Sequence, residues 1–152
     1  MKKILVILLI LAAFYYWSSG ETNTAAIVEK PTQDLAYSKT NRINDEIELA
    51  YKNRQSNVQV SGTGTVIKLL RDDNEGARHQ KFILRLSSGQ TLLIAHNIDL
   101  APRVNSISNG DQVQFYGEYE WNNKGGVVHW THHAPNGHHY GGWLKHKGKT
   151  YQ

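Results

Sequence analysis

The longest run of hydrophobic positions lies near the start of the chain, where fourteen apolar or aromatic residues extend from Ile4 to Trp17. Two lysines precede this run, and small and polar residues follow it from Ser18. As a helix the run would rise only about 21 Å, short of a hydrocarbon core about 30 Å thick, which is more typical of an export signal than of a full membrane span. We therefore predict a signal peptide or membrane anchor over residues 1–20.

The same segment predicts where the protein works. The lysines favour the cytoplasmic side, so the remainder of the chain is expected outside the cytoplasm, either periplasmic or anchored to the membrane. The sequence is compatible with cleavage after Gly20 and with retention in the inner membrane. Ser18 and Gly20 are small enough for a signal peptidase site, whereas the aromatic residues before them disfavour cleavage.

Beyond this run the spacing of hydrophobic positions changes. Residues 21–40 are polar, contain Pro31 and show no period, which predicts a linker. Four apolar residues then fall on one helical stripe: Ile43, Ile47, Ala50 and Tyr51. We expect an amphipathic helix over residues 42–54 at the start of a single domain, residues 41–152.

From position 57 the hydrophobic positions alternate with polar ones, as they do in β-strands. Residues 57–70 form one long extended run that contains two glycines, which permit a bulge or a sharp coil. Residues 81–86 and 90–96 alternate in the same way on either side of a Ser-Ser-Gly turn. This pattern predicts a hairpin.

The remaining hydrophobic pattern predicts two more strands. One begins at Gly110-Asp111, after an irregular stretch that contains Pro102, and the turn 122–125 leads into the other at 126–131. A long, coiled first strand and a break between the third and fourth strands are the plan of an OB-type barrel. The predicted fold class is therefore mainly β, a small five-stranded OB-type antiparallel barrel after one helix, with an SH3-like barrel as the alternative.

The last predicted hairpin has a definite register. If Trp121 pairs with Gly126 across the turn, the residue numbers of every facing pair add up to 247. The facing pairs are then Glu118 and His129, Tyr116 and Thr131, Gly117 and Trp130, and Phe115 and His132. The first two pairs belong to the outer face and the last two to the buried face, where Gly117 is expected to leave room for the indole.

Composition restricts the chemistry that this domain can perform. The 152 residues suffice for one domain, and the absence of cysteine excludes disulfides, thiolate metal ligands and thiol catalysis. Histidine, present eight times, is the soft-metal ligand that is left. Residues 122–152 contain four lysines and six histidines but no acidic residue, so this end either attracts an anionic partner or forms a solvated tail.

The pairing of Glu118 with His129 is the first candidate site. A carboxylate beside an imidazole orients it and raises its basicity, as acid–base and metal sites require, although exposed sheets also contain such pairs without a function. Together with His79, at the end of the first long loop, these two residues form the predicted catalytic group.

The density of histidines also predicts a site for a divalent transition metal such as zinc. The predicted ligands are His129, His132, His133 and His138. Along a strand His129 and His133 would lie about 13 Å apart, too far to share one ion. A single site therefore requires the chain to turn near Thr131 and to bring His138 or His139 back; otherwise these histidines are packing or surface residues.

A second set of candidates would bind an anionic ligand, because guanidinium and ammonium groups pair with phosphate and aromatic rings stack on bases. The predicted ligand-binding residues are Arg78, His96, Arg103, Tyr116, Trp121 and Lys124. In an OB-type barrel the first-to-second and fourth-to-fifth loops border the usual binding face, so Arg78 and His79 are expected near Glu118 and His129.

Five sequence blocks stand out: residues 78–82, 95–103, 117–122, 125–133, which read GGVVHWTHH, and 142–146. Together they resemble an uncharacterised family of small exported bacterial proteins, a domain of unknown function. The resemblance extends over about residues 56–152. It implies a bacterial envelope protein with an OB-like domain, and it implies no activity and no catalytic residue.

Three functions are compatible with the sequence. We favour an exported binding module that presents a His/Arg/aromatic face to an anionic ligand such as nucleic acid, a nucleotide or an envelope glycan. The alternative is a small metal-dependent hydrolase, a phosphodiesterase or nuclease, that uses the histidines; a structural envelope protein is the third. The hydrolase requires His79, His96 and residues 129–139 to converge in one cleft, whereas the binding module requires only an open basic and aromatic face.

Overall fold

A computed structural model of the chain describes residues 44–152, all of which belong to one compact unit. The predicted signal or anchor segment, the linker and the first residues of the predicted helix lie outside the described residues. Within residues 44–152 no helix is both long and apolar enough to cross a membrane. The export of the chain therefore stays a prediction.

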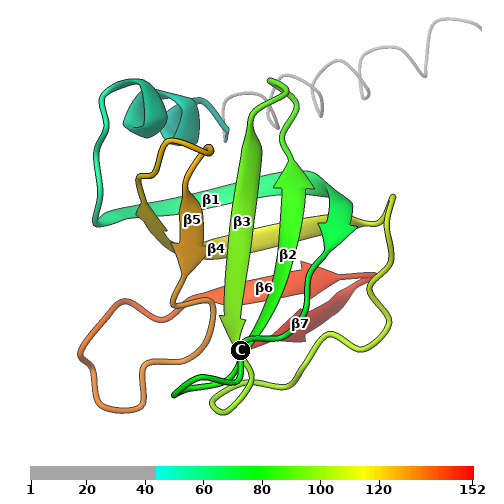
Figure 1. Cartoon of the computed structure of the whole chain (residues 1–152). Coiled ribbons are helices and arrows are strands. Elements are labelled where there is room, and N and C mark those ends of the chain that lie inside the picture. Colours follow the sequence, from blue (N-terminus) through cyan, green and yellow to red (C-terminus); the bar gives the residue numbers. More distant parts are fainter. Residues whose placement is uncertain (1–43) are drawn as a thin grey trace, which may run out of the picture. The chain divides into compact units, whose positions relative to one another are not determined.

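Seven strands form one sheet that closes into a barrel (Figure 1). Their bounds are β1 Val58–Leu69, β2 His79–Arg85, β3 Thr91–Asn97, β4 Gln112–Glu120, β5 Val127–His129, β6 Trp143–His146 and β7 Lys149–Tyr151. Their order in the sheet is β1-β2-β3-β5-β4-β6-β7, and β1 pairs with β4 as well. The β1–β4 pairing closes a ring of five strands, beside which β6 and β7 extend the sheet from β4.

The strand order confirms the predicted OB-like barrel. β5 lies between β3 and β4, and no strand occurs between β3 and β4 in sequence, where the break was predicted. We had predicted an antiparallel barrel. All pairs of strands in the ring are antiparallel except β3 and β5, which run parallel. A ring with an odd number of strands cannot alternate direction at every step, so one parallel pair is unavoidable.

The long first strand changes its partner halfway along. Residues 58–65 pair with β4 and residues 65–69 pair with β2, so Thr65 has a register partner in both strands. Glycine makes the close approach at this corner possible, because a Cβ on Gly64 would lie 2.9 Å from the Cβ of Leu84. The predicted coil of the first strand at its glycines is thereby confirmed.

The helix covers residues 44–52 of the described chain and lies beside the β2–β3 turn in Figure 1. Its apolar stripe is confirmed, because Ile47 and Ala50 are fully buried in the barrel core. The side-chain amide of the buried Asn44 bonds both backbone groups of Thr63 in β1. Its Oδ1 accepts from the Thr63 N–H, and its Nδ2 donates to the Thr63 carbonyl, both at 3.3 Å. The helix therefore closes one end of the barrel.

The predicted register of the β4–β5 hairpin is confirmed for three pairs and wrong beyond them. Three facing pairs add up to 247: Glu118 with His129, Tyr119 with Val128, and Glu120 with Val127. The strand ends there, because Trp130 adopts a φ of 50° that turns the chain away. The room beside Gly117 is filled by Val128 and by Thr131, which is fully buried rather than on the outer face, and not by the indole.

Of the two alternatives for residues 122–152, the solvated tail does not hold over the last part, which forms the β6–β7 hairpin. Lys147 and Gly148 have φ values of 47° and 80°, as a two-residue turn between antiparallel strands requires. β6 pairs with the first half of β4, so Phe115 faces Leu144 and Tyr116 faces Trp143 instead of the predicted His132 and Thr131. One edge of β4 is thus divided between β6 and β5.

Candidate functional site

Polar side chains cross the outer face of β1, β4 and β5. Tyr119 and Val128 point into the core, so their neighbours along each strand point outward. The register then sets Gln59, Glu118 and His129 side by side on three adjacent strands. We call the following four residues the β4–β5 site: Gln59, Glu118, Glu120 and His129.

The geometry of this site suits a metal ion. One ligand atom each from Glu118, Glu120 and His129 lies within 4.8 Å of the others. The Nε2 of His129 is 3.5 Å from Oε1 of Glu118, and a tetrahedral ion with bonds of about 2.1 Å holds its ligand atoms about 3.4 Å apart. The imidazole and the Glu118 carboxylate are therefore spaced as two ligands of one ion are, and an oxygen of Glu120 lies within 4.8 Å of both.

Unpartnered polar atoms are concentrated around this site. Within residues 44–152, the buried side-chain atoms without a hydrogen-bond partner are Gln59 Nε2 and Oε1, His129 Nε2 and His132 Nε2. Proteins satisfy nearly all buried polar groups, so those left without partners indicate strain, an ion or a functional role. Two of the residues involved belong to the β4–β5 site, and the third follows it in the chain.

The charges around His129 oppose one another. Burial lowers the pKa of His129, whereas the carboxylates of Glu118 and Glu120 act in the opposite direction. Neither glutamate has a lysine or arginine partner among the described residues, although Oε1 of Glu120 accepts from the backbone N–H of Asn57 at 3.3 Å. A lowered pKa keeps His129 neutral, the form in which an imidazole nitrogen can bind a metal.

The segment that follows β5 brings further aromatic rings to the site. Residues 130–142 form the orange loop at lower left in Figure 1, and the N–H of Gly142 closes it by donating to the His132 carbonyl at 2.8 Å. The Trp130 ring lies 5.2 Å from the His129 ring and stacks on His139 at 4.2 Å. The chain does turn near Thr131, as a single metal site requires, and of the two histidines considered it is His139 that returns.

Backbone carbonyls fix the tautomers of two imidazoles in this loop. Nδ1 of His132 lies 2.6 Å from the His133 carbonyl, and Nδ1 of His139 lies 2.7 Å from the Tyr140 carbonyl. A carbonyl only accepts, so each Nδ1 carries the hydrogen and each Nε2 has a lone pair to offer. Burial also lowers the pKa of His132. Metal-binding histidines are commonly oriented in this way.

Comparison with protein families places the chain. Residues 32–152 match the family described as Protein of unknown function (DUF3465). The chain belongs to this family. A comparison with curated proteins finds no match. The resemblance to a family of unknown function, which the sequence blocks indicated, is confirmed.

The two arginines among the predicted ligand-binding residues of this DUF3465 domain are held by carboxylates. The Nε of Arg78 lies 2.7 Å from Asp99, and Arg103 contacts both carboxylate oxygens of Asp72 at 3.0 and 3.1 Å. These pairs fix the loops around β2, and they leave less positive charge for an anion than the sequence indicated.

His96 and His79 lie near the histidine loop but differ in exposure. His96 is fully buried, and its two ring nitrogens are bonded to the Thr131 hydroxyl and the Pro102 carbonyl. Burial lowers the pKa of His96 to about 4. A positive charge on His79 would act in the same direction, on His96 and on His132. The histidines at positions 79, 96 and 132 therefore do gather at one end of the barrel, although His96 has no free nitrogen.

The other predicted site residues do not gather in one place. Tyr116 lies 6.2 Å from Trp143 on the outer face, and His133 and His138 are exposed in the loop. Trp121 donates from Nε1 to the Tyr51 carbonyl at the helix end of the DUF3465 domain, and Lys124 belongs to the neighbouring turn. These last two are separated from His96 by the length of β3.

Sequence reasoning missed two residues of the β4–β5 site. Neither Glu120 nor Gln59 was among the predicted site residues. The Glu-x-Glu spacing could have indicated Glu120, because residues two apart on a strand share a face. Gln59 could be found only from the pairing of β1 with β4, which no local pattern reveals.

Proposed function

We propose that this DUF3465 domain binds a divalent transition-metal ion through Glu118, Glu120 and His129 and presents that ion to an anionic ligand. The observation that carries the proposal is the concentration of unpartnered polar atoms around three potential ligands. An ion would give the His129 nitrogen a partner and would neutralise the two carboxylates. Both effects stabilise the bound state relative to the metal-free one.

The ligand types favour zinc or a similar ion. One imidazole nitrogen and two carboxylate oxygens are common zinc ligands, whereas calcium and magnesium prefer oxygen ligands throughout. Three protein ligands leave a fourth tetrahedral position for a ligand from solution. The adjacent rings of Trp130 and His139 provide a surface on which a base or sugar could stack.

The ligand that we propose is anionic, as a nucleic acid, a nucleotide or a charged envelope glycan would be. A phosphate or carboxylate oxygen would occupy the open metal position. The ion would then supply the positive charge, because Arg78 and Arg103 are already paired with Asp99 and Asp72. This differs from the purely basic face that the sequence indicated. Binding of the anionic ligand should therefore require the metal ion.

A hydrolase is the second candidate, and one feature favours it. Catalytic zinc sites keep an open position for water, and the proposed three-residue ligand set would do the same. A phosphodiesterase or nuclease would in addition need a group to move protons, for which the lone pair on Nε2 of His139 or His132 is suitably placed in the loop.

We also propose that the domain works outside the cytoplasm. The support is the apolar segment Ile4 to Trp17 after two lysines. A fusion of residues 1–56 to a reporter that is active only after export should score positive. An inactive exported reporter beside an active cytoplasmic one would contradict this proposal.

Metal content tests the proposed site. The purified full-length protein, stripped with a chelator and dialysed against zinc, should retain about one equivalent as measured by mass spectrometry of the metal. His129→Gln and Glu120→Gln should each weaken binding by at least about 10-fold, since each removes a ligand. His133→Gln is the matched control, because it removes an exposed histidine four positions away.

Two results would count against the proposal. If the parent retains no metal, the third interpretation, a structural envelope protein, gains weight. If His133→Gln lowers the metal content as much as His129→Gln does, the ion is held by the histidine-rich loop and not by the β4–β5 site. Titration of an oligonucleotide into the zinc-loaded and metal-free protein, with an assay for phosphodiester cleavage, then separates the binding module from the hydrolase.

A further inference from the structure

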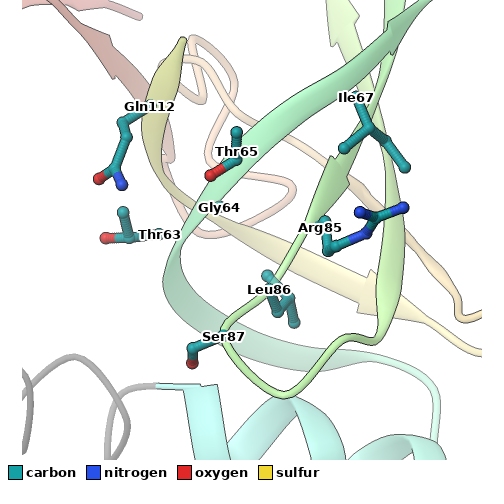
Figure 2. Close-up of a pocket in the computed structure, with 8 residues that line it drawn as sticks. All are labelled: Thr63, Gly64, Thr65, Ile67, Arg85, Leu86, Ser87 and Gln112. Carbon is teal, nitrogen blue, oxygen red and sulfur yellow. The ribbon is translucent and has the colours of Figure 1, made fainter. Parts of the chain in front are cut away.

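A second site lies where β1 passes from β4 to β2. A pocket of about 310 Å³ opens on the outer face of the barrel at this corner (Figure 2). Thr65 stands between Arg85 of β2 and Gln112 of β4, because it is the register partner of both. Gln59 of the β4–β5 site is six positions away along β1, about 20 Å in an extended strand, so the two sites are distinct.

Every polar side chain of this pocket can donate a hydrogen bond, and Arg85 can only donate. Arg85 is exposed and, in contrast to Arg78 and Arg103, forms no salt bridge with any residue of the described chain. No carboxylate lines the pocket. The Ser87 oxygen already accepts from Asn44 Nδ2 at 3.1 Å, so its hydroxyl hydrogen is left to donate. Such a set of donors around one arginine favours an anion.

The apolar part of the lining restricts the anion further. Ile67 and Leu86 contribute aliphatic surface, and no aromatic side chain lines the pocket. Sites for nucleobases and sugars commonly offer an aromatic ring for stacking. The volume lies at the lower end of the range of about 300 to 1,000 Å³ that is typical of small-molecule sites. The occupant should therefore be small and aliphatic.

We propose that this pocket binds a small aliphatic carboxylate. Arg85 would hold the carboxylate with two parallel hydrogen bonds from its guanidinium, which lies beside Ile67 in Figure 2. The aliphatic body would then pack on Ile67 and Leu86. Binding here requires no metal and is independent of the function proposed for the β4–β5 site.

The test is a titration of the full-length protein with pentanoate, followed by the shifts of its backbone amide signals in NMR spectra. The shifts should be largest for residues 63–67, 85–87 and 112. Arg85→Gln should weaken binding at least about 10-fold, and Arg85→Lys should weaken it less, because an ammonium keeps the charge but loses the two-pronged contact. Arg71→Gln is the control, since Arg71 is exposed and lies outside the pocket.

Three outcomes would overturn the proposal. The first is that pentanoate shifts no signal of the pocket. The second is that Arg71→Gln weakens binding as much as Arg85→Gln, which would indicate a nonspecific charge effect. The third is that inorganic phosphate binds as tightly as pentanoate, because the aliphatic body would then contribute nothing. Circular dichroism of each variant, matching that of the parent, excludes unfolding as the cause of a loss.

Discussion

Two pairs of histidines in this barrel differ in how their ring nitrogens are bonded. His96 lies at the end of β3 and His146 at the end of β6, and both are fully buried with partners on both nitrogens. His129 at the end of β5 and His132 just after it are also largely enclosed, yet each has an Nε2 without a partner. Histidines in this small domain thus fall into two groups, one with both ring nitrogens bonded and one with a nitrogen that has no partner.

This difference separates structural from functional histidines better than their position in the sequence does. A buried imidazole with two hydrogen bonds holds its neighbours in place, as His96 does by joining Thr131 to the loop at Pro102. A buried imidazole with a bare nitrogen contributes less to stability and offers a lone pair to a ligand. The predictions below test this contrast, from the largest expected effect to the smallest.

Acid should destabilise the protein in large part through His96. Burial lowers the pKa of His96 from 6.5 to about 4, so between these values the unfolded chain binds a proton that the folded chain does not. This contribution is complete above pH 6.5 and is lost as the pH falls to 4, by about 3 kcal/mol. Urea unfolding at several pH values measures it, and a His96→Gln variant with the parent's pH slope would contradict it.

Gly117→Ala should cost about 2 kcal/mol and should also reduce metal binding. A Cβ at this position would collide with the backbone oxygen of His129, so β5 must shift away from β4. Thermal unfolding and metal content give the two readouts. Gly141→Ala serves as the control, because the nearest atom to its added Cβ is 3.8 Å away. Equal effects of the two substitutions would refute the close approach at Gly117.

Thr131→Val should cost about 1–2 kcal/mol. The Thr131 hydroxyl lies 2.8 Å from Nδ1 of His96, and because Nε2 faces the Pro102 carbonyl, Nδ1 is the acceptor. The substitution leaves this buried nitrogen without a donor. Chemical denaturation measures the loss, and a change below about 0.3 kcal/mol would show that His96 does not depend on this bond.

His129→Gln should change the stability of the metal-free protein by less than about 0.5 kcal/mol, since the contact of Nε2 with Glu118 is long, at 3.5 Å, and Nε2 has no hydrogen bond to lose. The same substitution in zinc-saturated protein should cost more, because the bound ion stabilises only the parent. Comparing the unfolding midpoints with and without zinc measures both values. A large loss in the metal-free protein would place His129 with the structural histidines.

The sequence predicted the parts of the fold that depend on local alternation. It predicted the helix, the strands up to β5 and the pairing of Glu118 with His129, because these follow from periodicity and from one short turn. It failed at Trp130, where the alternation of residues continues but the strand does not. The cause is distant in sequence: Leu144 and Trp143 of β6 occupy the edge of β4 that the longer β5 would have needed.

The candidate site was predicted in part for the same reason. Glu118 and His129 could be paired from the hairpin alone, whereas Gln59 enters through β1 and His139 returns through a loop whose path no local pattern fixes. The salt bridges that hold Arg78 and Arg103 likewise join residues more than twenty positions apart. Sequence reasoning therefore found the residue types of the site but not their partners.

The most direct test of the central claim is the ¹⁵N NMR signal of the histidine rings during titration with zinc. With one equivalent of zinc, we predict that Nε2 of His129 shifts to the position of a metal-bound nitrogen, while the signals of His96 and His146 stay unchanged. If the exposed His133 and His138 respond first and His129 does not respond, the ion is bound elsewhere and the β4–β5 site is not a metal site.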